Sequence, residues 1–309
     1  MRKLWIDTDC ASDDGMAILM AMFSTEIDVV GISIVSGYRA ASKVWKNPFI
    51  FCEKANVAPP PIFMGSDVPF GFRYVLPEVH VHGEDGMGDL NCPLPAGSVI
   101  GNKHAAIALL DSINANPGEI EIITLGPLTN LALAFRLDPN AYKKIKKLWI
   151  MGGTGRAVGN ISPVAEANIG GDPEASQVVF TSGVKFELIT LEASGGSMFY
   201  STDDIAALVK LGKTGRFLID TSHDMISFLT AAGIPGLIMA DPAAMGYALW
   251  LDLEITGADV YCEVEHKEGL TYGMVVEDAT GMRPSNCHAV YKMNGDLFKE
   301  RVCQLFNGR

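Results

Sequence analysis

The chain has 309 residues, of which 48% are hydrophobic, and its formal net charge is -12 at pH 7. This hydrophobic content is sufficient for a large buried core and argues against a disordered chain. The negative charge argues against nucleic acid as a partner, because a phosphate backbone is bound by clustered cations. A small ligand without phosphate is still compatible with this charge.

The start of the chain and its cysteines indicate a cytoplasmic protein. Residues Met1-Arg2-Lys3 lead directly into a short apolar run, so no signal peptide is expected. No apolar run reaches the roughly 18 residues of a membrane span, so no membrane contact is expected either. The six cysteines are scattered and form no C-x-x-C pair, which is typical of reduced thiols.

Hydrophobic periodicity predicts alternating strands and helices along the chain. Strands are expected at 4–8, 28–35, 61–65, 119–125, 147–151 and 185–191. Helices are expected at 15–20, 40–55 (with a kink at Pro48), 103–115, 131–137, 173–179, 202–211, 214–229, 241–250 and 294–306. Three late strands, at 259–264, 270–276 and 287–292, are expected to form a small antiparallel annex.

The fold class follows from this alternation. It predicts an α/β protein with a central, mostly parallel, Rossmann-like sheet flanked by helices. No linker or repeat divides the chain, so residues 1–309 are expected to form a single domain.

An acidic stretch directly follows the first predicted strand. Four carboxylates fall within eight positions, at Asp7, Asp9, Asp13 and Asp14. The carboxyl ends of strands are where open α/β sheets bind ligands, and crowded carboxylates repel one another unless a cation is bound. A hard divalent cation with oxygen ligands is the simplest explanation. Capping of the following helix by Ser12 or Asp13 is the alternative, but it explains one or two of the four.

Two further polar segments lie in regions without clear periodicity. The Gly- and Pro-rich residues 66–100 contain His80 and His82, which could chelate a metal or simply bind the backbone; no third soft ligand follows them. In the second segment, Asn160, Glu166 and Asn168 are evenly spaced and could converge on a polyhydroxyl ligand if the segment is extended. Turn formation is the alternative interpretation of these asparagines.

Together, these motifs resemble the nucleoside hydrolase family of the inosine-uridine-preferring N-ribohydrolase type, nearly end to end. The matching motifs, in chain order, are Asp7-Thr-Asp9-x-x-x-Asp13-Asp14, Thr124–Asn130, Met151–Gly153, Asn160…Glu166-x-Asn168, Asp172–Ala175 and Asp241. The resemblance implies Ca2+-dependent hydrolysis of the N-glycosidic bond of ribonucleosides to ribose and a free base. It also implies a role in purine or pyrimidine salvage and assembly as a homodimer or homotetramer.

The resemblance also implies a role for each matching residue. One Ca2+ would be held by Asp9, Asp14, the carbonyl of Leu125 and Asp241. Asp9 would act as the general base that activates water. The ribose would be bound by Asp13, Asn160, Glu166 and Asn168, with Met151 packed near the sugar.

The sequence departs from the family pattern where the leaving base is expected. Ala240 occupies the place of a histidine that assists the base in one branch of the family, and Tyr38 occupies the place of an asparagine. Cys10-Ala11 replaces the usual Pro-Gly. Three residues are candidates for a substitute acid: His82, His223 and Cys10. The segments 66–90 and 223–240 are expected to cover the base and to be mobile without ligand.

Three alternative functions follow from these departures. The first is hydrolysis of a ribosyl-pyridinium such as nicotinamide riboside, whose leaving group departs neutral and needs no acid. The second is ribose or nucleoside binding with little turnover. The third is an Mg2+ phosphatase with an aspartyl nucleophile, which an Asp-x-Asp motif after a strand also marks; Cys10-Ala11 does not fit it, and it leaves the 160–175 motif unexplained.

Overall fold

The computed structural model describes residues 1–71 and 81–309, so His80 of the predicted histidine pair lies outside the described residues. The strands are β1 (Arg2–Thr8), β2 (Ile27–Ile34), β3 (Ile62–Met64), β4 (Ile120–Thr124), β5 (Lys147–Met151), β6 (Phe186–Ile189), β7 (Tyr200–Ser201), β8 (Gly236–Leu237), β9 (Glu254–Val264), β10 (Val275–Asp278) and β11 (Cys287–Met293). The α-helices are α1 (Ser12–Phe23), α2 (Ala41–Val44), α3 (Asn47–Lys54), α4 (Ala105–Ala115), α5 (Thr129–Leu137), α6 (Ala167–Gly171), α7 (Pro173–Phe180), α8 (Thr202–Lys210), α9 (Lys213–Thr221), α10 (His223–Ala231), α11 (Ala240–Leu249) and α12 (Gly295–Phe306).

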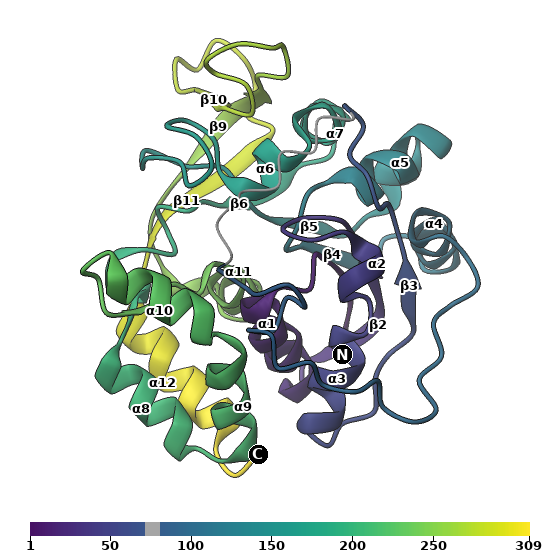
Figure 1. The fold of residues 1–309 in the computed structure, drawn as a ribbon. Helices are drawn as coiled ribbons and strands as arrows, with labels where there is room; N and C mark the ends of the chain where they lie inside the picture. Colours follow the sequence, from purple (N-terminus) through teal and green to yellow (C-terminus); the bar gives the residue numbers. More distant parts are fainter. Residues whose placement is uncertain (72–80) are drawn as a thin grey trace.

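The central sheet confirms the predicted α/β architecture. Within the described residues, nine strands form one sheet in the order β10-β9-β11-β6-β5-β4-β1-β2-β3 (Figure 1). Strand β1 pairs in parallel with both β2 and β4, and β4, β5 and β6 continue the parallel arrangement. The carboxyl ends of these parallel strands therefore meet at one edge of the sheet.

The late strands form the predicted antiparallel annex, and β11 joins it to the main sheet. Strand β9 runs antiparallel to β10 and β11, as expected, but β11 is also parallel to β6. The annex is therefore continuous with the main sheet. Neighbouring residues Ala289 and Val290 are both fully buried, because β11 has strands on both edges and is covered on both faces. A separate two-stranded antiparallel sheet is formed by β7 and β8.

Two predicted helices are each divided in two. The predicted 40–55 helix is interrupted at Trp45 and Lys46. Pro48 does not kink a helix but lies in the first turn of α3. Proline is tolerated there, because a backbone N–H in the first turn has no hydrogen-bond partner within the helix. The 214–229 helix is interrupted at Ser222. The hydroxyls of Thr221 and Ser222 both donate to the carbonyl of Leu218, at 2.8 and 3.0 Å, and so compete with the helical bonds there.

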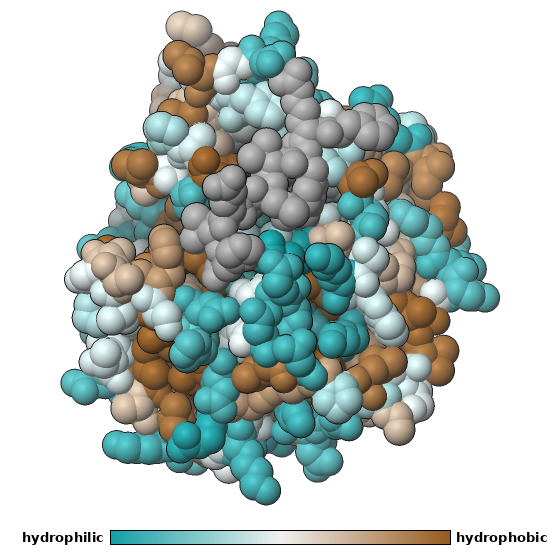
Figure 2. All heavy atoms as spheres, viewed as in Figure 1, coloured by the Kyte–Doolittle hydropathy of each residue, from teal (hydrophilic) through white to brown (hydrophobic). Residues whose placement is uncertain are grey.

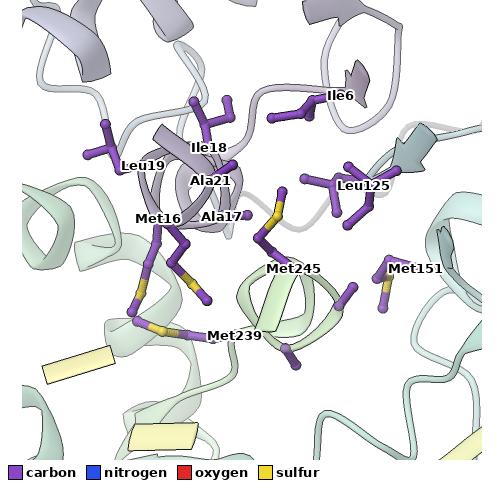
Figure 3. Close-up of a cluster of buried hydrophobic side chains, with 14 of the residues drawn as sticks. Ile6, Met16, Ala17, Ile18, Leu19, Ala21, Leu125, Met151, Met239 and Met245 are labelled. Carbon is purple, nitrogen blue, oxygen red and sulfur yellow. The ribbon is translucent and has the colours of Figure 1, made fainter. Parts of the chain in front are cut away.

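Buried side chains form two clusters that include residues on opposite sides of the sheet. One cluster includes residues of α1, α3, α11 and α12, and the other includes residues of α4, α5 and α7. Figure 3 shows Met245 of α11 between Ala17 of α1 and Leu125 at the end of β4. Gly15 permits close packing of α1 on α3, because a Cβ there would lie 2.2 Å from Cε1 of Phe51. Dense packing thus fixes α1 and α11, the two helices that carry buried acidic residues at the sheet edge.

The surface is mixed in character. On the face shown in Figure 2, hydrophilic and hydrophobic side chains are interspersed over much of the area. Among the helices formed by the described residues, none combines the length and apolarity that a membrane span requires.

Candidate active site

The turn between β1 and α1 carries the acidic residues. Cys10 adopts a left-handed conformation with φ of 56°, which reverses the chain sharply after Asp9. The carboxylate of Asp14 then closes the turn. Its Oδ2 accepts from the backbone N–H of Ala11 at 2.8 Å, and its Oδ1 accepts from the hydroxyl of Thr8. We refer to residues 9–14 as the acidic turn.

Asp7 does not belong to this group, so the expectation that four carboxylates share one cation is wrong for this residue. Its Oδ1 accepts from Nδ2 of Asn130 at 2.9 Å and from the hydroxyl of Ser33. Burial raises the pKa of Asp7 to about 7. Asp7 therefore links β1 to β2 and α5.

Asp13 and Asp14 instead meet Asp241, which lies in the first turn of α11. Each of the three offers an oxygen within 4.8 Å of the others, and all three are buried. Burial, followed by the charges of neighbouring carboxylates, raises the pKa of both Asp14 and Asp241 well above the ordinary value. A buried, all-oxygen donor set of this kind fits a hard divalent cation.

Asp9 lies beside this trio rather than within it. Its Oδ2 accepts from the backbone N–H of Tyr38 at 3.2 Å. Burial raises the pKa of Asp9 to about 6. Gly37 permits this contact, because a Cβ there would lie 1.8 Å from Oδ2 of Asp9. The segment that follows β2 therefore orients the carboxylate of Asp9.

A cavity of about 310 Å³ opens onto the acidic turn. Most of the residues expected to touch a ligand line it. Its polar residues, which we call the polar lining, include Asp9, Asp13, Asn160, Glu166, Asn168 and Asp241. Tyr38, His82, Leu125 and Met151 also line the cavity. The chain thus brings together segments that are far apart in sequence.

Glu166 and Asn168 converge by a different route from the predicted extended segment. Glu166 is the N-cap of α6, and its carboxylate accepts from the backbone N–H groups of Asn168 and Gly153, at 2.8 and 3.0 Å. Burial raises the pKa of Glu166 to about 7. The side-chain amide of Asn168 donates to the carbonyl of Met151 at 3.2 Å. The helix start therefore fixes both residues against the end of β5.

The three candidates for a substitute acid lie in different places. His82 lines the cavity and is 5% exposed; its Nδ1 lies 2.7 Å from Oγ of Ser12 and 4.0 Å from Oδ1 of Asp13. Its ring contacts that of Tyr38 edge to face, with centroids 4.7 Å apart. Burial lowers the pKa of His82, so the neutral ring is favoured.

Cys10 and His223 do not line this cavity. The Cys10 thiol is fully buried, and its Sγ lies 3.6 Å from the hydroxyl of Thr8. Burial, followed by the charge of Asp14, raises its pKa well above the ordinary value. The side chain of His223 is 73% exposed, and its Nδ1 lies 3.3 Å from Asp224. Neither residue reaches the cavity in this structure.

A second group of cavity residues is apolar, and all but Leu191 lie in the segments 66–90 and 223–240 that were expected to cover the base. This apolar lining comprises Val81, Leu191, Met225, Phe228, Leu229 and Ile238. Ala240 also lines the cavity, at the position that a histidine occupies in one branch of the family that the sequence resembles. An apolar residue on a helix has the same sequence pattern whether it faces a core or a cavity, so no sequence signal identified Phe228. Ser12, which contacts His82, was considered solely as a helix cap.

Comparisons with known proteins point to one family. The family model described as inosine-uridine preferring nucleoside hydrolase matches residues 4–300. The chain is 35% identical over 243 residues to a probable uridine nucleosidase 1 of Oryza sativa subsp. japonica, covering 78% of this chain and 75% of that protein. It is 32% identical over 305 residues to the pyrimidine-specific ribonucleoside hydrolase RihB of Escherichia coli O1:K1 / APEC, covering 96% of this chain and 94% of that protein.

Solved structures show the same fold. A plant nucleoside hydrolase, the PpNRh1 enzyme, superimposes with a TM-score of 0.91 at 28% identity, covering 100% of this chain and 99% of that one. An inosine-guanosine nucleoside hydrolase superimposes with a TM-score of 0.91 at 26% identity, covering 99% of both chains.

Proposed function

We propose that this chain, which belongs to the inosine-uridine preferring nucleoside hydrolase family, hydrolyses the N-glycosidic bond of ribonucleosides to ribose and a free base in a Ca2+-dependent reaction. One observation carries the proposal. Asp9 and Asp13 of the acidic turn share one cavity with the rest of the polar lining at the carboxyl edge of a parallel sheet, and Asp14 lies directly beside Asp13 and Asp241. Such a site suits a neutral polyhydroxyl substrate beside a cation.

The proposed cation would be held by Asp9, Asp14, Asp241 and the carbonyl of Leu125, with Asp13 within reach of the same position. The crowding of Asp13, Asp14 and Asp241 supports a cation beside Asp14 and Asp241, because their mutual repulsion disfavours three charges without a cation. Asp9 and Leu125 are assigned from the family resemblance. A bound divalent ion supplies a Lewis acid that lowers the pKa of a coordinated water.

We assign proton transfer and ribose binding to carboxylate and amide side chains of the chain. Asp9, held by the N–H of Tyr38, accepts the proton of the attacking water. Asn160, Glu166 and Asn168 bind the ribose hydroxyls and fix the sugar for attack at C1′. The negative charges around the sugar stabilise the positive charge that develops in an oxocarbenium-like transition state. This parallels glycoside hydrolysis by single displacement.

His82 is our choice for assisting the departing base, through the N–H that its neutral ring can donate. It lines the cavity, whereas Cys10 and His223 do not. A second candidate function is favoured by the apolar lining and by Ala240: hydrolysis of a ribosyl-pyridinium, whose leaving group departs neutral. For ordinary bases, loss of a general acid costs about 10²–10⁴-fold in rate.

Reducing-sugar release from uridine, cytidine, inosine and nicotinamide riboside, each with and without EGTA, tests both candidates. EGTA-sensitive release from the neutral nucleosides, restored by added Ca2+, is the expected result. Release from nicotinamide riboside alone would favour the second candidate. No release from any of the four would contradict turnover and favour a binding protein; activity that survives exhaustive chelation would contradict the metal assignment.

We further infer, from the family resemblance, that the protein acts as a homodimer or homotetramer in the cytoplasm. All six cysteines are free in the structure, which supports a reducing compartment. Light scattering on a size-exclusion column measures the assembly, and a monomer of about 33 kDa would contradict it.

A further inference from the structure

Residues 82–91, which we call the His82 segment, form a closed loop held largely by its own carboxylates. The side chain of Asp85 accepts from the backbone N–H groups of Met87, Asp89 and Asn91, at 2.7, 3.0 and 2.8 Å. The N–H of Gly88 donates to the carbonyl of His82 at 2.9 Å. The loop is therefore a compact unit, and its position over the cavity depends on what it is attached to.

Asn47, at the start of α3, attaches this unit to the acidic turn. Its side-chain Nδ2 donates to the carbonyl of Cys10 at 3.0 Å and to the carbonyl of Asp85 at 2.8 Å. Both partners are carbonyl oxygens, which cannot donate, so the nitrogen must face them. One buried amide thus spans the two segments that carry Asp9 and His82.

Asn47 makes these two bonds although its own side-chain oxygen is left without a hydrogen-bond partner among the described residues. Asn47 is fully buried. The carbonyl of Cys10 belongs to the residue in the left-handed conformation. Gly86 packs against the same point: a Cβ there would lie 3.0 Å from Nδ2 of Asn47 and 3.1 Å from the carbonyl oxygen of Cys10. A side chain at Gly86 would therefore crowd the contact between the two segments.

Two more bonds fix the His82 end of the loop. Ser12 in the acidic turn contacts the ring of His82, as described above. Nε of Arg39 donates to the carbonyl of Gly83 at 3.2 Å. Among these contacts, only those of Asn47 connect a backbone carbonyl of the acidic turn with a backbone carbonyl of the His82 segment.

We propose that Asn47 is a positioning residue for the reaction, which sets the position of His82 relative to the acidic turn. The proposal rests on the role of His82 in the proposed function. Asn47 touches no part of the cavity itself, so its effect must pass through the two backbones that it joins. Loss of the amide should free the His82 segment while leaving the polar lining in place.

The first test is independent of turnover. Hydrogen exchange of peptides covering residues 82–91 is compared in the wild type, Asn47→Ala and Asn286→Ala. Asn286 is a matched control, because its Nδ2 also bridges two carbonyls, those of Phe180 and Cys262, both at 2.9 Å, away from the cavity. We expect exchange about tenfold faster in Asn47→Ala and unchanged in Asn286→Ala. Unchanged exchange in Asn47→Ala would overturn the proposal, whatever the activity of the enzyme.

The second test asks whether the effect passes through His82. Asn47→Ala should lower kcat for uridine about tenfold with KM changed less than about twofold, because ribose binding is retained. In a His82→Ala background the same change should lower kcat less than about twofold. Additive losses in the double variant would overturn the positioning role and leave the proposed function intact. If Asn47→Ala does not fold, Asn47→Leu, which is close in size and has no donor, is measured by both tests.

Discussion

The polar lining and the apolar lining share one cavity, but different parts of the fold supply them. Most of the polar lining follows β1 or β5, where the sheet and two helix starts hold the side chains by backbone hydrogen bonds. The apolar lining comes largely from α10 and the segment before α11, outside the central sheet. The groups proposed for bond cleavage are thus held by the strands, whereas the groups proposed to contact the leaving base belong mostly to helices and loops outside the sheet.

The largest effect should come from the polar lining. Asp9→Asn removes the proposed base and should lower kcat by about 10²–10⁴-fold without loss of the fold. Ribose release and thermal unfolding measure the two quantities. Asp28→Asn, which changes an exposed carboxylate on β2, is the control and should retain full activity. Near-normal turnover by Asp9→Asn would remove the distinction between the two linings.

The apolar lining should affect binding rather than chemistry. The side chain of Phe228 is 47% exposed and lines the cavity, so Phe228→Ala should cost about 1 kcal/mol of binding, or about fivefold in KM, with kcat nearly unchanged. Steady-state kinetics with uridine and inosine measure both constants. Leu270→Ala, at a residue that is 97% exposed, is the control. A fall in kcat with constant KM would show that α10 takes part in the chemical step.

The smallest effect should come from outside both linings. The ring of His288 on β11 contacts Asp259 at 2.7 Å and Glu254 at 3.0 Å. Burial lowers the pKa of His288, but these hydrogen bonds outweigh it and raise the pKa above its ordinary value of 6.5. The charged ring therefore adds stability that is fully present below pH 6.5 and is lost as the pH rises through the raised pKa.

His288→Gln tests this pH dependence. It should lower the urea midpoint at pH 6 by no more than about 0.3 M and should have a smaller effect at pH 9. Activity should be unchanged at both pH values, because neither lining contains His288. An equal loss of stability at pH 6 and pH 9 would contradict the charged pairing.

The sequence predicted those features of the fold and site that depend on neighbouring residues along the chain. The apolar run before Asp9 and the helical pattern after Asp14 correctly placed the acidic turn between β1 and α1, and the strand alternation predicted a mostly parallel sheet. The contact between Ser12 and His82 could not be predicted, because it joins two segments through a loop without periodicity. Likewise, the direction of β11 depends on its partner β6, which lies about one hundred residues earlier.

The carboxylate trio has a consequence for the synthesis of the protein. Asp13 and Asp14 emerge from the ribosome early, whereas Asp241 belongs to α11, which packs on α1 from the late part of the chain. A nascent chain that ends before α11 lacks one carboxylate of the trio. The proposed cation would stabilise a chain that includes α11 more than one that ends before it. Ion uptake would therefore report that synthesis has passed α11.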